Sequence, residues 1–381
     1  MIYLDNNATT RIAPRVLEAM MPYLTDSYAN ASSTHEFGSK MNEAVKKGRA
    51  QIAQLIGAEN NEVVFTSGAT EAINLAIKGI ATNYREKGKH IVTVSTEHSA
   101  VLDTCKYLET IGYEITYLPV QADGLLDLEL VKKSIRDDTL LLCIMFVNNE
   151  TGVIQQIKEI AEIAHLKGTF FMTDGTQAVG KLPVNVTELG IDLMSFSAHK
   201  FYGPKGIGGL YVRGKRPNKV KLPTLIHGGG HEKGMRSGTL NVPGIVGMGE
   251  AAEIANNEML TDTKRIGGLR DNLEKELLKI ENTLLNGNPI RRLYNVSNIC
   301  FRGADSDAIM IDLKGITVSN GSACTSASIE PSHVLKAMGF SDDVAFSSIR
   351  FSLGRFNTQK EIEVVSPLIL RIVKELRVMK V

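Results

Sequence analysis

Short apolar runs alternate with amphipathic segments over the first two thirds of the chain. The runs at 61–67, 90–95 and 113–120 have the length and the β-branched content of buried strands. The segments between them, 70–88 and 100–112, carry apolar residues at helical spacing. The alternation continues with expected strands at 139–147, 169–175, 192–197 and 206–212 and an expected helix at 157–168.

Strands that alternate with helices of this length favour an α/β fold with a mostly parallel central sheet covered on both faces. In such sheets, ligands bind at the carboxyl ends of the strands. Polar residues that directly follow the apolar runs are therefore the first candidates for a functional site.

The pattern changes near residue 255. A charged stretch at 261–285 predicts a long helix that runs into the turn sequence "NGNP", and shorter strands and helices follow. We predict a smaller α+β domain formed by residues 1–15 and 256–381, and a large ligand-binding domain formed by residues 16–255. No Pro/Ser-rich linker separates the two, so we expect them to pack together.

The composition narrows the class of protein. The chain has 381 residues, a formal net charge of +1 and 22% charged residues, which gives no global attraction to nucleic acid or to anionic membranes. No segment offers about 18 uninterrupted apolar residues, and the first residues lack the basic and then apolar pattern of a signal peptide. We expect a cytoplasmic protein that contacts neither a membrane nor nucleic acid directly.

The four cysteines are widely separated and form no Cys-x-x-Cys pair, which favours a reducing compartment over a disulfide or zinc framework. Cys105, Cys143 and Cys300 lie in apolar segments and are expected to be buried and inert. Cys324 differs, because it lies in the small and polar run "SNGSACTSASIEP", which predicts an exposed loop.

One expected strand ends in "TSGAT", residues 66–70, and a helix begins at once. The unpaired N–H groups of a helix's first turn, together with nearby hydroxyls, can hold a phosphate. An ordinary capped helix explains this segment equally well. The sequence lacks the Gly-x-x-x-x-Gly-Lys-Ser/Thr pattern of an NTPase loop.

Two further strand ends carry polar groups. Asp174 ends the expected strand at 169–175, and Lys200 follows the strand at 192–197. Taken alone, the aspartate can simply cap a turn and the lysine can be a solvated surface charge. Beside a phosphate site, they fit another chemistry, because a lysine Schiff base needs a positioned aldehyde and a partner for the pyridinium nitrogen.

The combination of motifs closely resembles the pyridoxal-phosphate-dependent cysteine desulfurases of the nitrogen-fixation and iron-sulfur-assembly type. The resemblance runs from "YLDNNATT" to "SSIRFSLGR", nearly the whole chain. It rests on the motifs "TSGATEAIN", "TEHSAV", "VNNETG", "TDGTQAVG", "SAHKFYGPKGIGGLYV", "GGGHEKGMRSGT" and "SNGSACTSASIEPSHVL" in this order. It implies fold type I, that of the aspartate-aminotransferase-like enzymes, and a homodimer with active sites at the subunit boundary.

The resemblance implies pyridoxal 5'-phosphate as the cofactor and assigns roles around it. Lys200 would bind it covalently, and Asp174 would pair with its ring nitrogen. His98 would stack on the ring and move protons. Gln177 and Asn149 would contact its phenolic edge. Its phosphate would be held by Ala69, Thr70, Ser197 and His199, and by Thr239 of the other subunit.

The resemblance also implies the substrate and the product. Arg350 would bind the carboxylate of L-cysteine, which suits its planar guanidinium, and Asn30 would assist it. The Cys324 thiolate would take the substrate sulfur as a persulfide and leave alanine. The sulfur would then pass to an acceptor protein, such as an iron-sulfur scaffold, for iron-sulfur cluster assembly or thiolation.

Other interpretations remain open at this point. One is a selenocysteine lyase, or another lyase or aminotransferase of the same fold and cofactor. Another is a non-catalytic sulfur-relay or scaffold protein. The segment "HGGGHEKG" does not match His-Glu-x-x-His, so we predict no metal site there. The segment "GPKGIGGL" precedes a strand and does not match a dinucleotide loop, so its glycines indicate close backbone packing.

Overall fold

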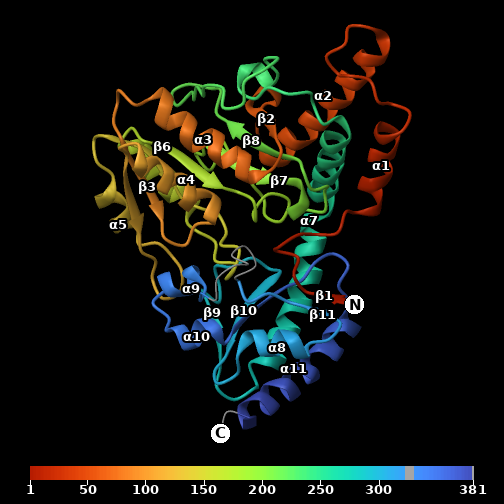
Figure 1. Ribbon diagram of the computed structural model, residues 1–381, viewed down its shortest axis with the longest axis vertical. Helices are drawn as coiled ribbons and strands as arrows, with labels where there is room; N and C mark the ends of the chain where they lie inside the picture. The colour runs from red at the N-terminus through yellow and green to blue at the C-terminus, as the bar shows by residue number, and fades with distance from the viewer. Residues whose placement is uncertain (322–329, 380–381) are drawn as a thin grey trace.

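The computed structural model describes residues 1–321 and 330–379 (Figure 1). Its strands are β1 (Ile2–Tyr3), β2 (Val63–Thr66), β3 (His90–Val94), β4 (Glu114–Leu118), β5 (Thr139–Cys143), β6 (Phe170–Asp174), β7 (Leu193–Ser197), β8 (Gly208–Val212), β9 (Thr283–Asn286), β10 (Val296–Phe301), β11 (Ile316–Thr317) and β12 (Ser348–Ser352). Its α-helices are α1 (Pro14–Leu24), α2 (Glu36–Ile56), α3 (Ala69–Asn83), α4 (Ser99–Thr110), α5 (Leu128–Ser134), α6 (Ile157–Leu166), α7 (Val242–Leu277), α8 (Ser306–Asp312), α9 (His333–Ala337), α10 (Asp342–Phe346) and α11 (Gln359–Met379). Short 3-10 helices are η1 (Asn60–Glu62), η2 (Ala198–Lys200) and η3 (Glu232–Gly234).

Within the described residues, the main sheet has seven strands in the order β2-β8-β7-β6-β5-β3-β4. The pairs from β7 through β6, β5 and β3 to β4 are parallel. Only β8 runs antiparallel to its neighbours β2 and β7. The prediction of a mostly parallel α/β sheet is therefore confirmed.

The sheet is buried on both faces because its strands carry apolar residues at successive positions. In β6, Phe171 packs into the core on one face, while the next residue, Met172, packs into the core on the other face. Helices α1, α2 and α6 and the first part of α7 contribute to the core that contains Phe171, and α3 and α4 contribute to the other core. A sheet enclosed in this way leaves its strand ends as the place for polar groups.

A second, antiparallel sheet has the order β12-β10-β9. Its residues share a separate core with α8, α11 and the later part of α7. In Figure 1, α7 runs from the upper part of the molecule, beside the main sheet, to the lower part with the small sheet. Along α7, core contacts change between Met259 and Ile266, and near the N-terminus they change between Leu4 and Ala13. The domain limits at residues 15 and 255 stay a prediction, which these two changes of core support.

Two expected helices end earlier than their sequence pattern indicates. The charged stretch at 261–285 is helical only to Leu277, and Thr283–Asn286 form β9. The reason is tertiary, because Leu284 and Leu285 pair with Cys300 and Ile299 of β10. The segment at 70–88 likewise ends its helix at Asn83, so the polar residues 84–88 form a turn.

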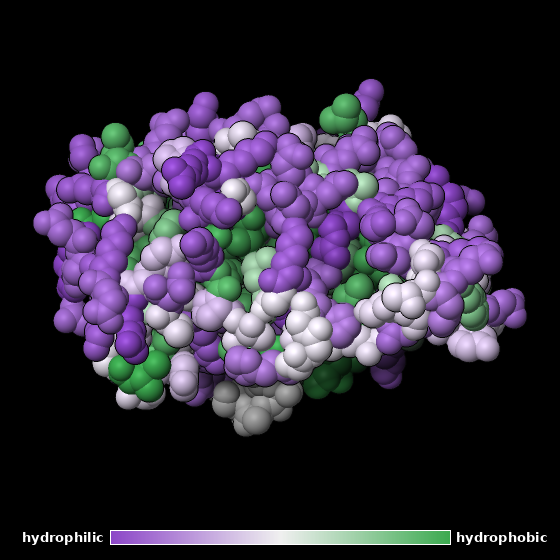
Figure 2. All heavy atoms as spheres, turned by 90° about the horizontal axis from the view of Figure 1, so that it is seen from above, coloured by the Kyte–Doolittle hydropathy of each residue, from purple (hydrophilic) through white to green (hydrophobic). Residues whose placement is uncertain are grey.

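Hydrophilic side chains cover most of the face seen from above, with smaller apolar areas between them (Figure 2). Among the described helices, none has the length and hydropathy that a bilayer crossing requires. Cys105, Cys143 and Cys300 are buried, as predicted from their apolar surroundings.

Candidate active site

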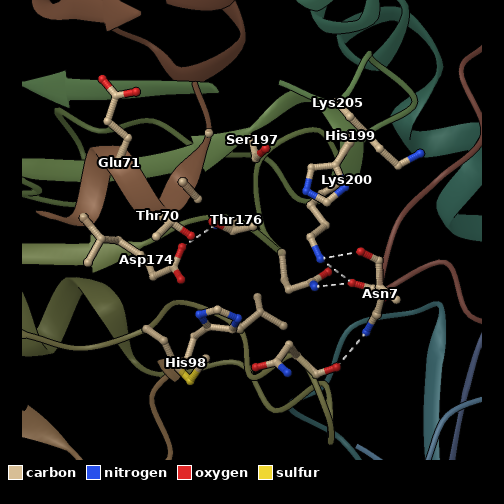
Figure 3. Close-up of a pocket in the computed structure, with 18 of the residues that line it drawn as sticks. Asn7, Thr70, Glu71, His98, Asp174, Thr176, Ser197, His199, Lys200 and Lys205 are labelled. Carbon is tan, nitrogen blue, oxygen red and sulfur yellow. Dashed lines mark hydrogen bonds between the residues drawn. The ribbon is translucent and has the colours of Figure 1, made fainter. Parts of the chain in front are cut away.

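A cavity of about 540 Å³ lies at the carboxyl ends of β6 and β7, where the main sheet meets the smaller part of the chain. The main sheet and its following loops supply most of the wall, and Asn7, Gly321 and Arg350 come from the opposite side. Ten residues predicted from sequence line it: Ala69, Thr70, His98, Asn149, Asp174, Gln177, Ser197, His199, Lys200 and Arg350. Figure 3 shows the side chains of many of them converging on this space.

The N-terminus of α3 forms one end of the cavity. The helix begins at Ala69, directly after Gly68, and Ser67 to Thr70 line the space. A Cβ atom on Gly208 would lie 2.6 Å from the carbonyl oxygen of Phe196 and 2.7 Å from Cα of Gly68, so β8 passes against the start of the helix. The close packing predicted from sequence for the glycines of 203–210 is confirmed for Gly203, Gly208 and Gly209, whereas a Cβ on Gly206 would meet no described atom within 4 Å. The arrangement presents unpaired N–H groups and the positive end of the helix dipole to an anion.

Lys200 ends the 3-10 helix η2, which follows β7 without a break. Its Nζ donates hydrogen bonds to the backbone oxygens of Asn7, at 2.7 Å, and Ala8, at 2.8 Å. Figure 3 shows the lysine pointing across the cavity to this segment. The amine is thus held by two neutral acceptors at the edge of the space that it would have to enter to form a Schiff base.

His199, next to Lys200, lines the cavity with its ring near Thr9, where Nδ1 and Oγ1 are 3.1 Å apart. Burial lowers the pKa of His199 to about 4, and the positive charges of Lys200, Lys205 and Lys181 act in the same direction. These same charges attract an anion. A bound phosphate would therefore relieve the repulsion that His199 feels.

Asp174 ends β6 and is buried. Its Oδ1 accepts hydrogen bonds from the backbone N–H of Thr176, at 2.9 Å, and from Oγ of Ser195, at 3.1 Å. Oδ2 accepts no hydrogen bond from the described residues, so it can accept one from a bound ring nitrogen. A carboxylate held by two donors stays suited to pairing with a cation.

His98 is the N-cap of α4 and lies across the cavity from Lys200 in Figure 3. Its Nδ1 accepts a hydrogen bond from the backbone N–H of Ala100 at 3.1 Å. Nδ1 therefore carries no proton in this arrangement, and a neutral ring has its proton on Nε2. Glu97, the residue before His98, is fully buried, and burial raises its pKa well above the usual value.

Arg350 lies in β12 and reaches the cavity from the small sheet. Its Nη2 lies 2.7 Å from Oδ1 of Asp5, and its Nη1 donates to the backbone oxygen of Asn149 at 3.0 Å. Its Nε is buried and has no hydrogen-bond partner among the described residues. Nη1 and Nη2 each carry a second hydrogen beyond these contacts, so the oriented guanidinium can bind a carboxylate ligand.

The residues at the cavity fit pyridoxal 5'-phosphate. An anion site, an amine and a buried carboxylate share one space, which is the donor set that its phosphate, aldehyde and ring nitrogen require. The hydroxyl of Thr176 also lines the cavity and is buried without a partner among the described residues, so the site has polar capacity that the chain does not use.

Three predicted site residues are not among the described residues that line this cavity. Thr239 and Asn30 are exposed and line no part of it, and Oδ1 of Asn30 accepts from the backbone N–H of Ser32. Cys324 lies outside the described residues. The roles assigned to these three positions stay predictions.

Sequence reasoning missed several residues that the fold brings to the cavity. Asn7, Thr176 and Lys205 line it, and Lys181 lies behind Gln177. Thr176 and Lys205 lie within motifs quoted for the resemblance, but neither has a local pattern that marks a site. Asn7 is 193 residues from Lys200 in sequence, so only the tertiary structure reveals their contact.

Comparison with known proteins identifies the family. The model described as Aminotransferase class-V matches residues 2–365. The protein "Cysteine desulfurase IscS" of Salmonella arizonae is 52% identical over 379 residues, which is 99% of this chain and 93% of the relative.

Solved structures agree in fold. A structure described as "NIFS-LIKE PROTEIN" has a TM-score of 0.91 and 37% identity, and covers 98% of this chain and 99% of its own. A structure described as "SspA in complex with cysteine" has a TM-score of 0.84 and 39% identity, with coverage of 94% and 100%. These similarities confirm fold type I and pyridoxal 5'-phosphate as the family's cofactor. The chain belongs to the class-V aminotransferase family and, within it, to the cysteine desulfurases of the nitrogen-fixation and iron-sulfur-assembly type.

Proposed function

We propose that this protein removes sulfur from L-cysteine, with pyridoxal 5'-phosphate bound at Lys200 and the sulfur accepted by Cys324. The observation that carries the proposal is the convergence of Lys200, Asp174 and the first turn of α3 on one cavity. The family of the chain and the cysteine-bound relative support the choice of substrate.

The cofactor, when bound, withdraws electrons from the substrate's carbon atoms. The residues of this chain hold it and move protons around it. Ala69, Thr70, Ser197 and His199 bind the phosphate, and Asp174 keeps a proton on the ring nitrogen through its carboxylate. The Nζ atom of Lys200 and the Nε2 atom of His98 are the groups that exchange protons with the substrate.

Arg350 selects an amino acid by its carboxylate. Asp5 and the carbonyl of Asn149 orient the guanidinium, and the surrounding residues remove it from water. A charge-assisted pair in such surroundings is stronger than one on the surface. The same contact fixes the direction of the substrate, with its side chain placed away from Arg350.

The net reaction converts L-cysteine and the thiol of Cys324 into L-alanine and a persulfide on Cys324. The carbon–sulfur bond of the substrate breaks, a sulfur–sulfur bond forms, and the thiol proton ends on alanine, so atoms and electrons balance. The thiolate is the attacking form. An acceptor protein then takes the sulfur, and the relatives' name supports an iron-sulfur scaffold as that acceptor.

We also infer a cytoplasmic homodimer. Exposed Thr239, which lies outside the cavity of its own chain, is then available to the phosphate site of a second subunit. The buried, unpaired cysteines among the described residues suit a reducing compartment.

The first experiment tests the cofactor. Purified protein loaded with pyridoxal 5'-phosphate should be yellow, borohydride should bleach the visible band, and Lys200→Ala should lack it. Protein that remains colourless after reconstitution would contradict the proposal.

The second experiment tests the sulfur acceptor. Cys324→Ser should keep the visible band but lose sulfide release from L-cysteine, while Cys105→Ser, at a buried cysteine in α4, serves as the matched control. Unchanged sulfide release by Cys324→Ser would favour a lyase that does not use this thiol. Absence of alanine from wild-type protein with L-cysteine would favour a non-catalytic role.

A further inference from the structure

Lys181 is a buried lysine next to the active site that the proposed reaction does not use. Only 3% of its surface is exposed. Its Nζ donates to Oε1 of Gln177 at 2.6 Å and to Oδ1 of Asn7 at 3.4 Å. Among the described residues its hydrogen-bond partners are two amide oxygens and no carboxylate, which is an unusual setting for a buried amine.

Burial of this amine disfavours its charged form electrostatically. Burial lowers the pKa of Lys181 well below its usual value, and the positive charges of Lys200 and Arg350 lower it further. A leucine or methionine would fill the same volume without this cost. The polar end of Lys181 therefore calls for an explanation in terms of what it contacts.

The hydrogen bond from Lys181 fixes the direction of the Gln177 side-chain amide at the wall of the cavity. Gln177 is 3% exposed, lines the cavity and donates from Nε2 to the backbone oxygen of Asn7 at 2.9 Å. Because Lys181 occupies Oε1, the amide nitrogen is the end that is directed to Asn7 and the cavity. Nε2 carries two hydrogens, and the described residues supply one acceptor for it, so the second can go to a ligand.

Asn7 joins this amide to the lysine of the site. Its backbone oxygen accepts from both Gln177 and Lys200, while its Oδ1 accepts from Lys181 and from Asn295. Hydrogen bonds through Asn7 and the side-chain amide of Gln177 thus connect Lys181 with Lys200. Each group in the connection is buried or partly buried, which strengthens its hydrogen bonds.

We propose that Lys181 is a positioning residue that holds Gln177 with its N–H directed at the phenolic edge of the cofactor. This inference rests on the proposed binding of pyridoxal 5'-phosphate at Lys200. An N–H donor at that edge favours the anionic phenolic oxygen, and so lowers the pH at which the bound cofactor loses its proton. Without Lys181, Gln177 keeps only its contact to Asn7 and the donor is less well placed.

The test is a double-mutant cycle read by absorbance. Lys181→Met and Gln177→Leu, singly and together, are loaded with the cofactor, and the visible band is titrated with pH. Lys181→Met should raise the midpoint of the titration by about half a unit to one unit, the size expected for one hydrogen bond. It should cause no further shift in the Gln177→Leu background.

Two results would overturn the inference. One is an equal shift by Lys181→Met in both backgrounds, since the lysine would then act by charge alone and not through Gln177. The other is an unchanged midpoint with only a lower melting temperature, which is the mark of a packing role. A wild-type protein without a visible band would instead refute the proposed function, so the two failures are distinguishable.

Discussion

Arg350 shows how one buried residue can depend on geometry as much as on charge. Its guanidinium uses Nη1 and Nη2 for Asn149 and Asp5, which leaves Nε as the buried donor without a partner among the described residues. A lysine offers one compact ammonium in place of this fork. Arg350→Lys should therefore raise the KM for L-cysteine by about 10- to 100-fold, as expected for the loss of one charge-assisted contact. Steady-state kinetics with the loaded enzyme measure this.

Arg355 supplies the control for that substitution. It is also largely buried, and it pairs with Asp262 at 2.6 Å, but it lies outside the cavity. Arg355→Lys should lower the melting temperature without changing KM. If both substitutions changed KM alike, the effect of Arg350→Lys would be one of general stability.

At this scale, the sequence predicts a residue well when its role follows from its place at a strand end. Asp174 and Lys200 end or follow apolar runs, so they could be expected at one edge of the sheet before any contact was known. Asp5 and Lys181 could not be predicted. Asp5 acts on Arg350 from 345 residues away, and Lys181 matters through its burial, which its own sequence segment does not reveal.

Among the elements, the contact of β8 with the start of α3 sets the shape of the anion site. A methyl group at Gly208 would meet backbone atoms of Phe196 and Gly68, which cannot move without shifting the strand or the helix. Overpacking of this kind costs about 1–3 kcal/mol of the free energy of unfolding. Gly208→Ala should therefore weaken binding of pyridoxal 5'-phosphate to the cofactor-free protein and lower its melting temperature. Titration of the visible band gives the dissociation constant.

Gly268 provides the opposite case in α7. It is exposed, and a Cβ there would meet no described atom within 4 Å outside its own helix turn. Gly268→Ala should stabilise the protein by about 0.5–1 kcal/mol, because alanine loses less backbone entropy in a helix. Equal affinity for the cofactor in the two variants would contradict the role assigned to Gly208.

Local pattern and tertiary pairing compete in setting where elements end. Strands β3, β5 and β7 of the main sheet could be predicted because each is a compact apolar run that is fully buried, whereas β4 at the edge of the sheet is only partly buried. The segment 283–286 could not, since its charged helical context continues up to it and only the pairing with β10 makes it a strand. The same holds for domain limits, because α7 crosses from one core to the other without a break in its helix.

On the scale of the whole molecule, the cavity depends on the meeting of the two cores. Lys200 and Asp174 come from the main sheet, whereas Arg350 comes from the small sheet and Asn7 follows the strand that pairs with β11. Substrate and cofactor groups are thus held from opposite sides. Thr239 is the predicted phosphate contact that this arrangement does not include, since it is exposed and outside the cavity.

A mixed dimer tests whether a second subunit supplies Thr239. Lys200→Ala removes the covalent link to the cofactor, and Thr239→Asp places a negative charge where the phosphate would bind, so each homodimer should be nearly inactive. A dimer with one chain of each kind, isolated with two affinity tags, would have one site with both lysine and threonine intact. It should show about half of the wild-type activity per dimer, because closed twofold symmetry makes the two sites equivalent. If the mixed dimer were no more active than the average of its parents, Thr239 would not act across the subunit boundary.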